Sequence, residues 1–159
     1  MSDIGITRGS LLKMKRLKYQ VEVAAPRERV WDVMLADSTY RDWTSIFSPG
    51  SHFVGEWVSG QEIRFLGEGG NEGMASRIAE SRRPEAVRIE HFGIVKDGVV
   101  DTTSEQARKW APSIEEYTFD ATPEGTRLEV VMDADESYVD FFDERWPKAL
   151  ARLKEIAEG

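Results

Sequence analysis

Cysteine is absent from this 159-residue chain, and its absence excludes disulfide bonds and thiol chemistry. Histidine is scarce: His52 and His91 stand far apart, without the HExxH-type spacing of metal-binding helices, so we predict no metal site. No apolar run approaches the roughly 20 residues that cross a bilayer, and the N-terminal residues lack the apolar core of a signal peptide. We therefore expect a cytoplasmic protein with no membrane partner.

An excess of positive charge is also missing. The 21 Lys and Arg residues face 29 Asp and Glu residues, for a net charge of −8, so we expect no nucleic-acid partner. The one basic cluster alternates with apolar residues, and we interpret it as the solvent face of a strand rather than as a binding patch; it comprises Arg8, Lys13, Lys15, Arg16 and Lys18.

Phosphate-binding and nucleophile motifs do not occur either. The glycines of GEGGNEG (Gly67–Gly73) are not followed by GK[ST], and they join two strands instead of opening a helix. The same segment lacks calcium-loop spacing, and Ser104 has no recognisable paired base. We therefore predict no cofactor.

The size and composition suit a single domain spanning 1–159, with an ordered core of about 14–157, and we expect a monomer. Leu17, Tyr19, Val21 and Val23 alternate with polar residues, which predicts a strand with one buried face. Two short helices should follow, and then six strands in sequence, within HFVGEW, QEIRFLG, MASRIAE, AVRIEHFGI, IEEYTFDA and TRLEVVMDA. The connection Lys96–Ser113 is predicted to be a long loop.

The last segment contains a proline in an otherwise helical pattern. The apolar positions Phe142, Trp146, Leu150 and Leu153 keep helical phase through Pro147, which favours one helix of about 20 residues that is kinked at the proline. The alternative is a helix that starts near 144, with Pro147 in its first turn. Ser137, followed three residues later by Asp140, resembles a capping box. An antiparallel sheet that packs on this helix is a two-layer α+β domain.

The segment APRERVWDVML resembles the entry of the START/Bet v 1-like (SRPBCC) superfamily, as do Trp43, Gly125-Thr126-Arg127-Leu128 and the pattern Trp146…Leu150…Leu153-Lys154. Within that superfamily, HFGIVKDGVVDTTSEQARKWAPSIEEYTF and RWPKALARLK are similar to a bacterial branch of the family related to activators of the heat-shock-protein-90 ATPase. The resemblance covers roughly residues 14–157. It implies the helix-grip fold: a curved seven-stranded antiparallel sheet wraps a long C-terminal helix, two short helices follow the first strand, and a cavity lies between sheet and helix. A kink at Pro147 would bend the helix over that cavity and set the size of its mouth.

Period-two counting selects the side chains that face this cavity, and its wall is mainly apolar and aromatic, as in small-molecule sites. The candidate ligand-binding residues are Trp43, Phe65, Met74, Ile78, Ile89, His91, Trp110, Tyr117, Phe119, Phe142 and Trp146.

Three polar side chains on this face are candidate acids or bases. His91 shares a strand face with Val87 and Ile89, where it is a general acid or base, a hydrogen-bonded core residue, or a residue at the strand end in solvent. Glu115 and Tyr117 share the inward face of the next strand. Trp110, in a polar segment, should dock onto the protein, either as a lid over the cavity or as an anchor for the loop.

Three functions are compatible with these features. The first is a binding module that carries, senses or sequesters a small, largely apolar molecule. The second is an acid–base enzyme of cyclase or dehydratase type that uses His91, Glu115 and Tyr117 in the same cavity. The third is an interaction protein, such as a chaperone cofactor. The superfamily's frame supports several activities, so the fold alone does not choose among them.

Overall fold

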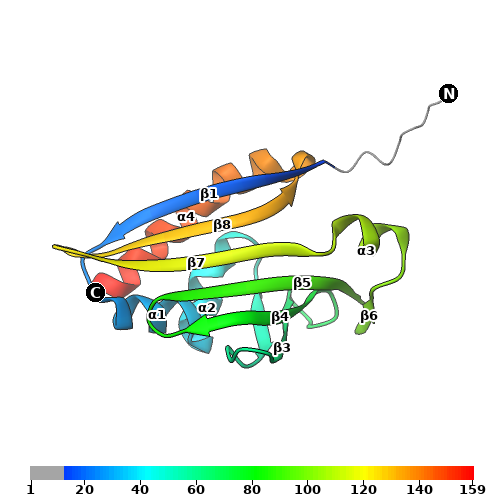
Figure 1. The fold of residues 1–159 in the computed structure, drawn as a ribbon, viewed down its shortest axis with the longest axis horizontal. Coiled ribbons are helices and arrows are strands. Elements are labelled where there is room, and N and C mark those ends of the chain that lie inside the picture. The colour runs from blue at the N-terminus through cyan, green and yellow to red at the C-terminus, as the bar shows by residue number, and fades with distance from the viewer. Residues whose placement is uncertain (1–12) are drawn as a thin grey trace.

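The computed structural model describes residues 13–159 as one antiparallel sheet with three helices, α1, α2 and α4, against one of its faces (Figure 1). In chain order the elements are β1 (Met14–Val23), α1 (Arg27–Leu35), α2 (Asp37–Trp43), η2 (Thr44–Ile46), β2 (His52–Gly55), β3 (Glu62–Leu66), β4 (Gly73–Arg82), β5 (Ala86–Lys96), β6 (Val99–Asp101), α3 (Glu105–Trp110), β7 (Ser113–Thr122), β8 (Gly125–Asp135), η3 (Glu136–Tyr138) and α4 (Val139–Glu158). Arg8 of the basic cluster lies outside the described residues.

The strands lie in the order β1-β8-β7-β5-β4-β3-β2, and all neighbouring pairs are antiparallel. The predicted seven-stranded sheet, long C-terminal helix and two short helices after the first strand are confirmed. One further strand, β6, pairs with β5 outside this path. Within residues 13–159, no helix combines the length and apolarity that crossing a membrane requires.

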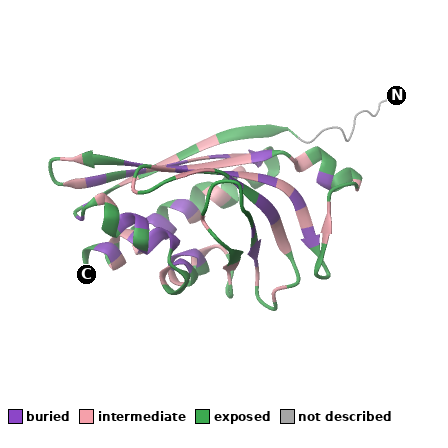
Figure 2. Cartoon of the chain, turned by 60° about the horizontal axis from the view of Figure 1, so that its bottom comes forward, coloured by how far each residue is buried: buried purple, intermediate pink, exposed green. Residues whose placement is uncertain are grey.

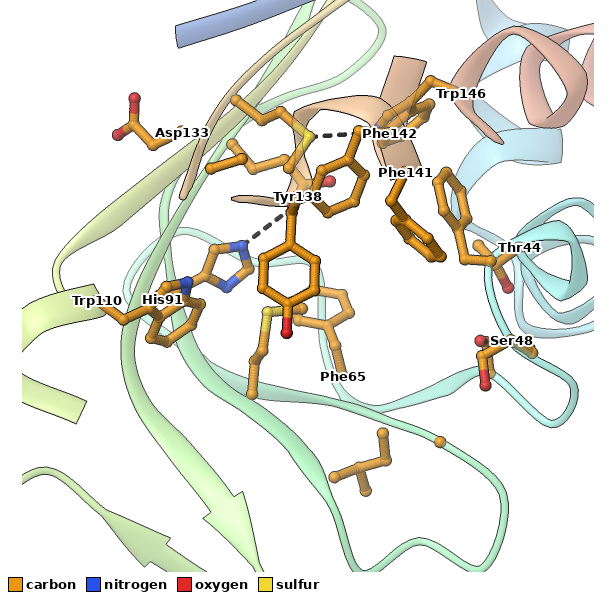
Figure 3. A pocket seen from close by; sticks show the side chains of 18 of the residues that line it. Thr44, Ser48, Phe65, His91, Trp110, Asp133, Tyr138, Phe141, Phe142 and Trp146 are labelled. Atoms are coloured by element: carbon orange, nitrogen blue, oxygen red, sulfur yellow. Dashed lines mark hydrogen bonds and ion pairs between the residues drawn. The ribbon is translucent and has the colours of Figure 1, made fainter. Parts of the chain in front are cut away.

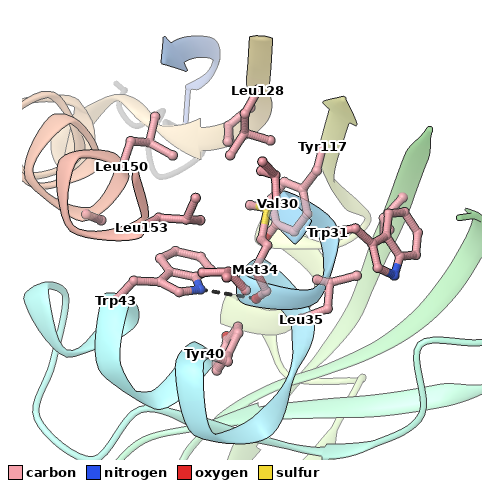
Figure 4. Packing of buried hydrophobic residues seen from close by; sticks show 14 of the residues in the cluster. Val30, Trp31, Met34, Leu35, Tyr40, Trp43, Tyr117, Leu128, Leu150 and Leu153 are labelled. Atoms are coloured by element: carbon pink, nitrogen blue, oxygen red, sulfur yellow. Dashed lines mark hydrogen bonds between the residues drawn. The ribbon is translucent and has the colours of Figure 1, made fainter. Parts of the chain in front are cut away.

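The core lies between the sheet and the helices that cover it (Figure 2). Along β5 and β8 nearly every second residue is buried, as period-two alternation requires when one face of a sheet packs on helices. Figure 4 shows Leu150 and Leu153 of α4 near Trp43 of α2, whose indole Nε1 donates to the Met34 carbonyl at 3.1 Å. This packing attaches the short helices to the long one.

The C-terminal segment is one helix, as predicted, and Pro147 lies inside it. Its buried side chains are Trp146, Ala149, Leu150, Leu153 and Ala157, so the apolar face continues across the proline. The predicted capping box is wrong in detail. The 3₁₀ turn η3 precedes the helix, and Asp135 instead of Ser137 supplies the side-chain acceptor, for the amide of Ser137.

The segment from Lys96 to Ser113 is more structured than the loop predicted for it. It contains β6 and the six-residue helix α3, whose N-cap Ser104 accepts a hydrogen bond from the amide of Ala107 at 3.1 Å. Trp110 is the last residue of this helix, so a helical turn and not a loop sets its position.

Candidate functional site

A pocket of about 570 Å³ lies between the inner face of the sheet and the start of α4 (Figure 3). Its wall also includes parts of α2, η2 and α3. Exposure changes sharply along it, since Trp43 and Trp146 are 1% and 3% exposed, whereas Tyr138 and Phe141 are 57% and 37% exposed. The pocket therefore has a buried end against the sheet and a rim at the start of α4.

Ten aromatic side chains line the pocket: Tyr40, Trp43, Phe47, Phe65, Trp110, Tyr117, Tyr138, Phe141, Phe142 and Trp146. Many of them pack on one another. The ring of Phe47 lies edge-on to Trp146, with centroids 4.9 Å apart, and Trp43 lies 5.9 Å from Trp146. Such contacts hold the rings in place before any ligand arrives, which lowers the ordering cost of binding.

Four polar side chains form a hydrogen-bonded chain across three neighbouring strands at the buried end. Ser76 Oγ lies 2.6 Å from His91 Nδ1, and His91 Nε2 lies 3.0 Å from Glu115 Oε1. The hydroxyl of Tyr117 donates to Glu115 Oε2 at 2.5 Å. Each of the four is buried or nearly so, and the exposed fraction of the Glu115 side chain is 13%.

Strand register brings these four residues together. Ser76 pairs with His91 across β4 and β5, directly after a register shift between Ala75 and Ser76. A bulge of this kind re-aims side chains and is common beside functional sites. Glu115 pairs with Ile89, so its side chain emerges on the inward face beside His91.

Hydrogen-bond chemistry assigns the protons in this chain. An ionised carboxylate only accepts, so the Glu115 carboxylate receives N–H from His91 Nε2 and O–H from Tyr117. In the neutral ring, His91 Nδ1 then accepts from the Ser76 hydroxyl. Burial, together with the nearby charge of Glu115, raises the pKa of Tyr117 well above its usual value, so the phenol remains a donor.

Trp110 covers His91 from the side of α3. The two rings stack with centroids 5.6 Å apart and an interplanar angle of 27° (Figure 3). The Ser113 hydroxyl donates to the Trp110 carbonyl and fixes the end of the helix. Trp110 therefore attaches α3 to the sheet, as an anchor would, and forms part of the pocket wall.

Most of the candidate residues named from the sequence lie in the pocket wall: Trp43, Phe65, Met74, His91, Trp110, Glu115, Tyr117, Phe142 and Trp146. Ile78, Ile89 and Phe119 lie outside it, with 0%, 0% and 1% exposure. Phe119 shares the inward face of β7 with Tyr117 but packs on Trp31 of α1, with ring centroids 5.3 Å apart. Alternation identified the correct face of each strand. It could not show which part of that face packs on a helix and which part lines the pocket.

Sequence reasoning missed several wall residues: Tyr40, Phe47, Tyr138 and Phe141. A signal existed for Tyr40, which precedes Trp43 by three residues and so shares its helix face. Met132 lies on the inward face of β8 with Leu128 and Val130, as alternation predicts. Nothing in the sequence pattern distinguished Tyr138 and Phe141, because both are largely exposed.

Comparison with known proteins gives a family model and structural relatives. The protein-family model described as Activator of Hsp90 ATPase homolog 1-like protein matches residues 24–158 of this chain. No curated protein matches the chain.

Among solved structures, protein MLL2253 from Mesorhizobium loti has 11% sequence identity and a TM-score of 0.67, over 89% of this chain and 95% of that one. ChR145 from Cytophaga hutchinsonii has 17% identity and a TM-score of 0.67, over 92% and 95%. The Aha1 dimer from Colwellia psychrerythraea has 14% identity and a TM-score of 0.67, over 91% and 96%. At these identities the likeness to solved structures establishes the fold alone.

Proposed function

The chain belongs to the family described as Activator of Hsp90 ATPase homolog 1-like protein, and from this premise and the geometry of the pocket we propose that it binds a small, largely apolar molecule between the sheet and α4. Binding would serve to carry, sense or sequester that molecule. The observation that carries the proposal is the pocket itself: its volume is about 570 Å³, within the roughly 300–1,000 Å³ usual for small-molecule sites, and ten aromatic side chains line it.

The energetics of such a wall favour apolar ligands. Burial of apolar surface contributes about 25 cal/mol per Å², so a ligand that loses about 300 Å² gains roughly 7 kcal/mol. Part of this gain offsets lost translational and rotational freedom. Because the rings already pack on one another, little further ordering of the protein is needed.

A ligand screen with a matched pair of variants tests the proposal. Apolar and aromatic metabolites are screened by thermal shift, where a ligand at 100 times its Kd adds about 2.7 kcal/mol, or several degrees in Tm. Ser48 and Ser45 are both exposed, but only Ser48 lines the pocket. We expect S48W to obstruct the mouth and abolish the shift, whereas S45W retains it.

Amide chemical shifts then locate each hit. Perturbations should fall on β5, β7, α3 and the first half of α4. Hits that bind S48W as tightly as the unmodified protein, or perturbations confined to the outer face of the sheet, would contradict the proposal.

The chain of Ser76, His91, Glu115 and Tyr117 favours a second candidate, acid–base catalysis of cyclase or dehydratase type on the bound molecule. Ser76 has 0% exposure and does not line the pocket, so it positions His91 and does not act as a nucleophile. Mass spectrometry of each hit incubated with protein tests this candidate. Turnover that persists unchanged in H91A would remove His91 from any catalytic role.

A further inference from the structure

One hydroxyl at the buried end of the pocket has no protein partner. Tyr40 lines the pocket and is only 8% exposed, yet its hydroxyl makes no hydrogen bond to any residue from 13 to 159. Among these residues, the one fully enclosed side-chain nitrogen or oxygen without a partner is Trp57 Nε1, so the Tyr40 hydroxyl is not fully enclosed, and Tyr40 is part of the pocket wall. A buried hydroxyl without a partner is costly, and a ligand atom can supply the missing bond.

The carboxylate of Glu115 has unused capacity in the same pocket. It accepts one bond at each oxygen, from His91 and from Tyr117, and no other donor among the described residues reaches it. An ionised carboxylate has about four acceptor sites, so roughly one remains at each oxygen. Because Glu115 lines the pocket, a ligand that donates a hydrogen bond can use one of them.

Ring packing places Tyr40 and Glu115 at the same end of the pocket. Tyr40 packs on Phe65 with centroids 6.3 Å apart, and Phe65 lies edge-on to His91 at 5.8 Å. His91 in turn contacts Glu115. Burial, with the charge of Glu115 adding to it, raises the pKa of Tyr40, so its phenol stays protonated and can donate.

The charges around the pocket disfavour an anionic ligand. Besides Glu115, the wall contains Asp133 and Asp135. Its one lysine, Lys109, has its Nζ 3.1 Å from Glu105 Oε1.

The two histidines of the wall have no free N–H group in the neutral state that could donate a hydrogen bond to an anion. In His52, Nδ1 donates to the Gly50 carbonyl, which leaves Nε2 of the neutral ring as an acceptor. Both ring nitrogens of His91 are already engaged. An anion entering this end would approach a carboxylate with no free cation in the described wall.

We infer, on the premise of the proposed function, that the pocket selects an aromatic or polycyclic molecule with an uncharged hydroxyl group, and that this hydroxyl donates to Glu115 and accepts from Tyr40. A hydroxyl is the group that fits, because it donates to an acceptor-only carboxylate and accepts from a phenol at the same time. An ether or ketone can only accept, and a carboxylate adds like charge.

Three naphthalene probes of the same shape test this inference by calorimetry at pH 7: 2-naphthol, 2-methoxynaphthalene and 2-naphthoate. We expect 2-naphthol to bind about tenfold or more tightly than 2-methoxynaphthalene, because a hydrogen bond to a charged group is worth more than its neutral counterpart. We expect 2-naphthoate to be the weakest of the three.

Three variants locate the selectivity. Y40F removes a donor that the hydroxyl of 2-naphthol and the ether oxygen of 2-methoxynaphthalene can both use, so both probes should lose affinity several-fold, whereas the ratio of the 2-methoxynaphthalene Kd to the 2-naphthol Kd should change little. E115Q keeps the size of the side chain and removes its charge, so this ratio should fall and 2-naphthoate should gain affinity. Y19F is the control, because Tyr19 does not line the pocket and its hydroxyl donates to Asp143, and its ratio should match that of the unmodified protein.

The outcomes separate this inference from the function on which it rests. Equal affinity for all three probes, or tighter binding of 2-naphthoate, overturns the hydroxyl selectivity and leaves apolar binding in place. No binding of any probe, with the protein folded by circular dichroism, overturns both. A ratio that E115Q leaves unchanged, or affinities that Y40F leaves unchanged, overturn the assignment to these residues, even where 2-naphthol is preferred.

Discussion

At the residue scale, the two phenols at the buried end of the pocket differ in their partners. Tyr117 donates to Glu115, whereas Tyr40 has no partner among the described residues. For both, burial is the largest cause of a raised pKa, and the charge of Glu115 adds to it. The neutral phenol is thus favoured in the folded state relative to the unfolded state.

The raised pKa values of these two phenols predict that the folded protein loses stability at alkaline pH. A pKa raised by folding contributes stability that is complete below the unfolded value, near 10, and is lost progressively as the pH rises above it. Each buried phenol then removes up to about 1.4 kcal/mol per pH unit. We expect the Tm of Y40F to fall less steeply than that of the unmodified protein between pH 10 and 12. Parallel Tm curves would show that Tyr40 ionises in the folded state as readily as in the unfolded chain.

Residue-level prediction succeeded where alternation was enough. His91 lies two residues after Ile89 on its strand, and Glu115 and Tyr117 alternate in the same way with Phe119, so all three were predicted to face inward. In the structure all three line the pocket on the inward face. Their mutual hydrogen bonds could not be predicted. These depend on the register of β4, β5 and β7 and on the shift at Ala75, and register is set by the whole sheet.

At the element scale, α4 contains a proline at a position where the helix continues on both sides. Pro147 has no N–H, so the carbonyl of Asp143 lacks its usual helical donor. The side chain of Asp143 is held separately, since the Tyr19 hydroxyl donates to its Oδ1 at 2.7 Å. The proline is exposed, and removing it costs no core packing.

Replacement of this proline should therefore stabilise the protein. P147A restores a hydrogen bond, and part of the gain is offset because the unfolded chain becomes more flexible. We expect a net increase in the free energy of unfolding of about 1–2 kcal/mol, measured by urea denaturation. K148A, a change at the neighbouring exposed residue that leaves the backbone bonds intact, should remain within about 0.5 kcal/mol. A destabilised P147A would show that Pro147 sets a helix geometry on which the packing of α4 depends.

The elements that the sequence did not predict are short ones. β6 has three residues and α3 has six, too few for a strand or helix period to emerge from the polar run in which they lie. By contrast, the 20-residue α4 was predictable because its apolar face repeats over several turns. The long connection, predicted as a loop, contributes Trp110, Lys109 and Gln106 to the pocket wall through α3.

At the scale of the whole molecule, burial is unevenly distributed. The inner faces of β5, β7 and β8 contain side chains of near-zero exposure, and α4 buries five. In α3, Ala107 is the one buried residue. Local stability follows such differences, because a segment with few buried contacts opens without the rest.

Hydrogen exchange should therefore reveal two classes of amide. We expect those in the centre of β7 and β8 and in the second half of α4 to exchange only through global unfolding. Amides of α3 should exchange at least 100-fold faster, through local opening. Mass-spectrometric exchange with peptides covering 96–113 measures this contrast, and equal protection of α3 and β8 would contradict it.

The unequal stability of the wall has a consequence for the time a ligand stays bound. The groups proposed to bind a ligand's polar end, Tyr40 and Glu115, lie on α2 and β7, whereas α3 covers His91 with the ring of Trp110. Displacing this short helix opens a path that leaves every strand pair intact. Loosening α3 would then speed entry and exit together, so the residence time of a ligand would shorten, by up to about 100-fold, while Kd stays nearly constant.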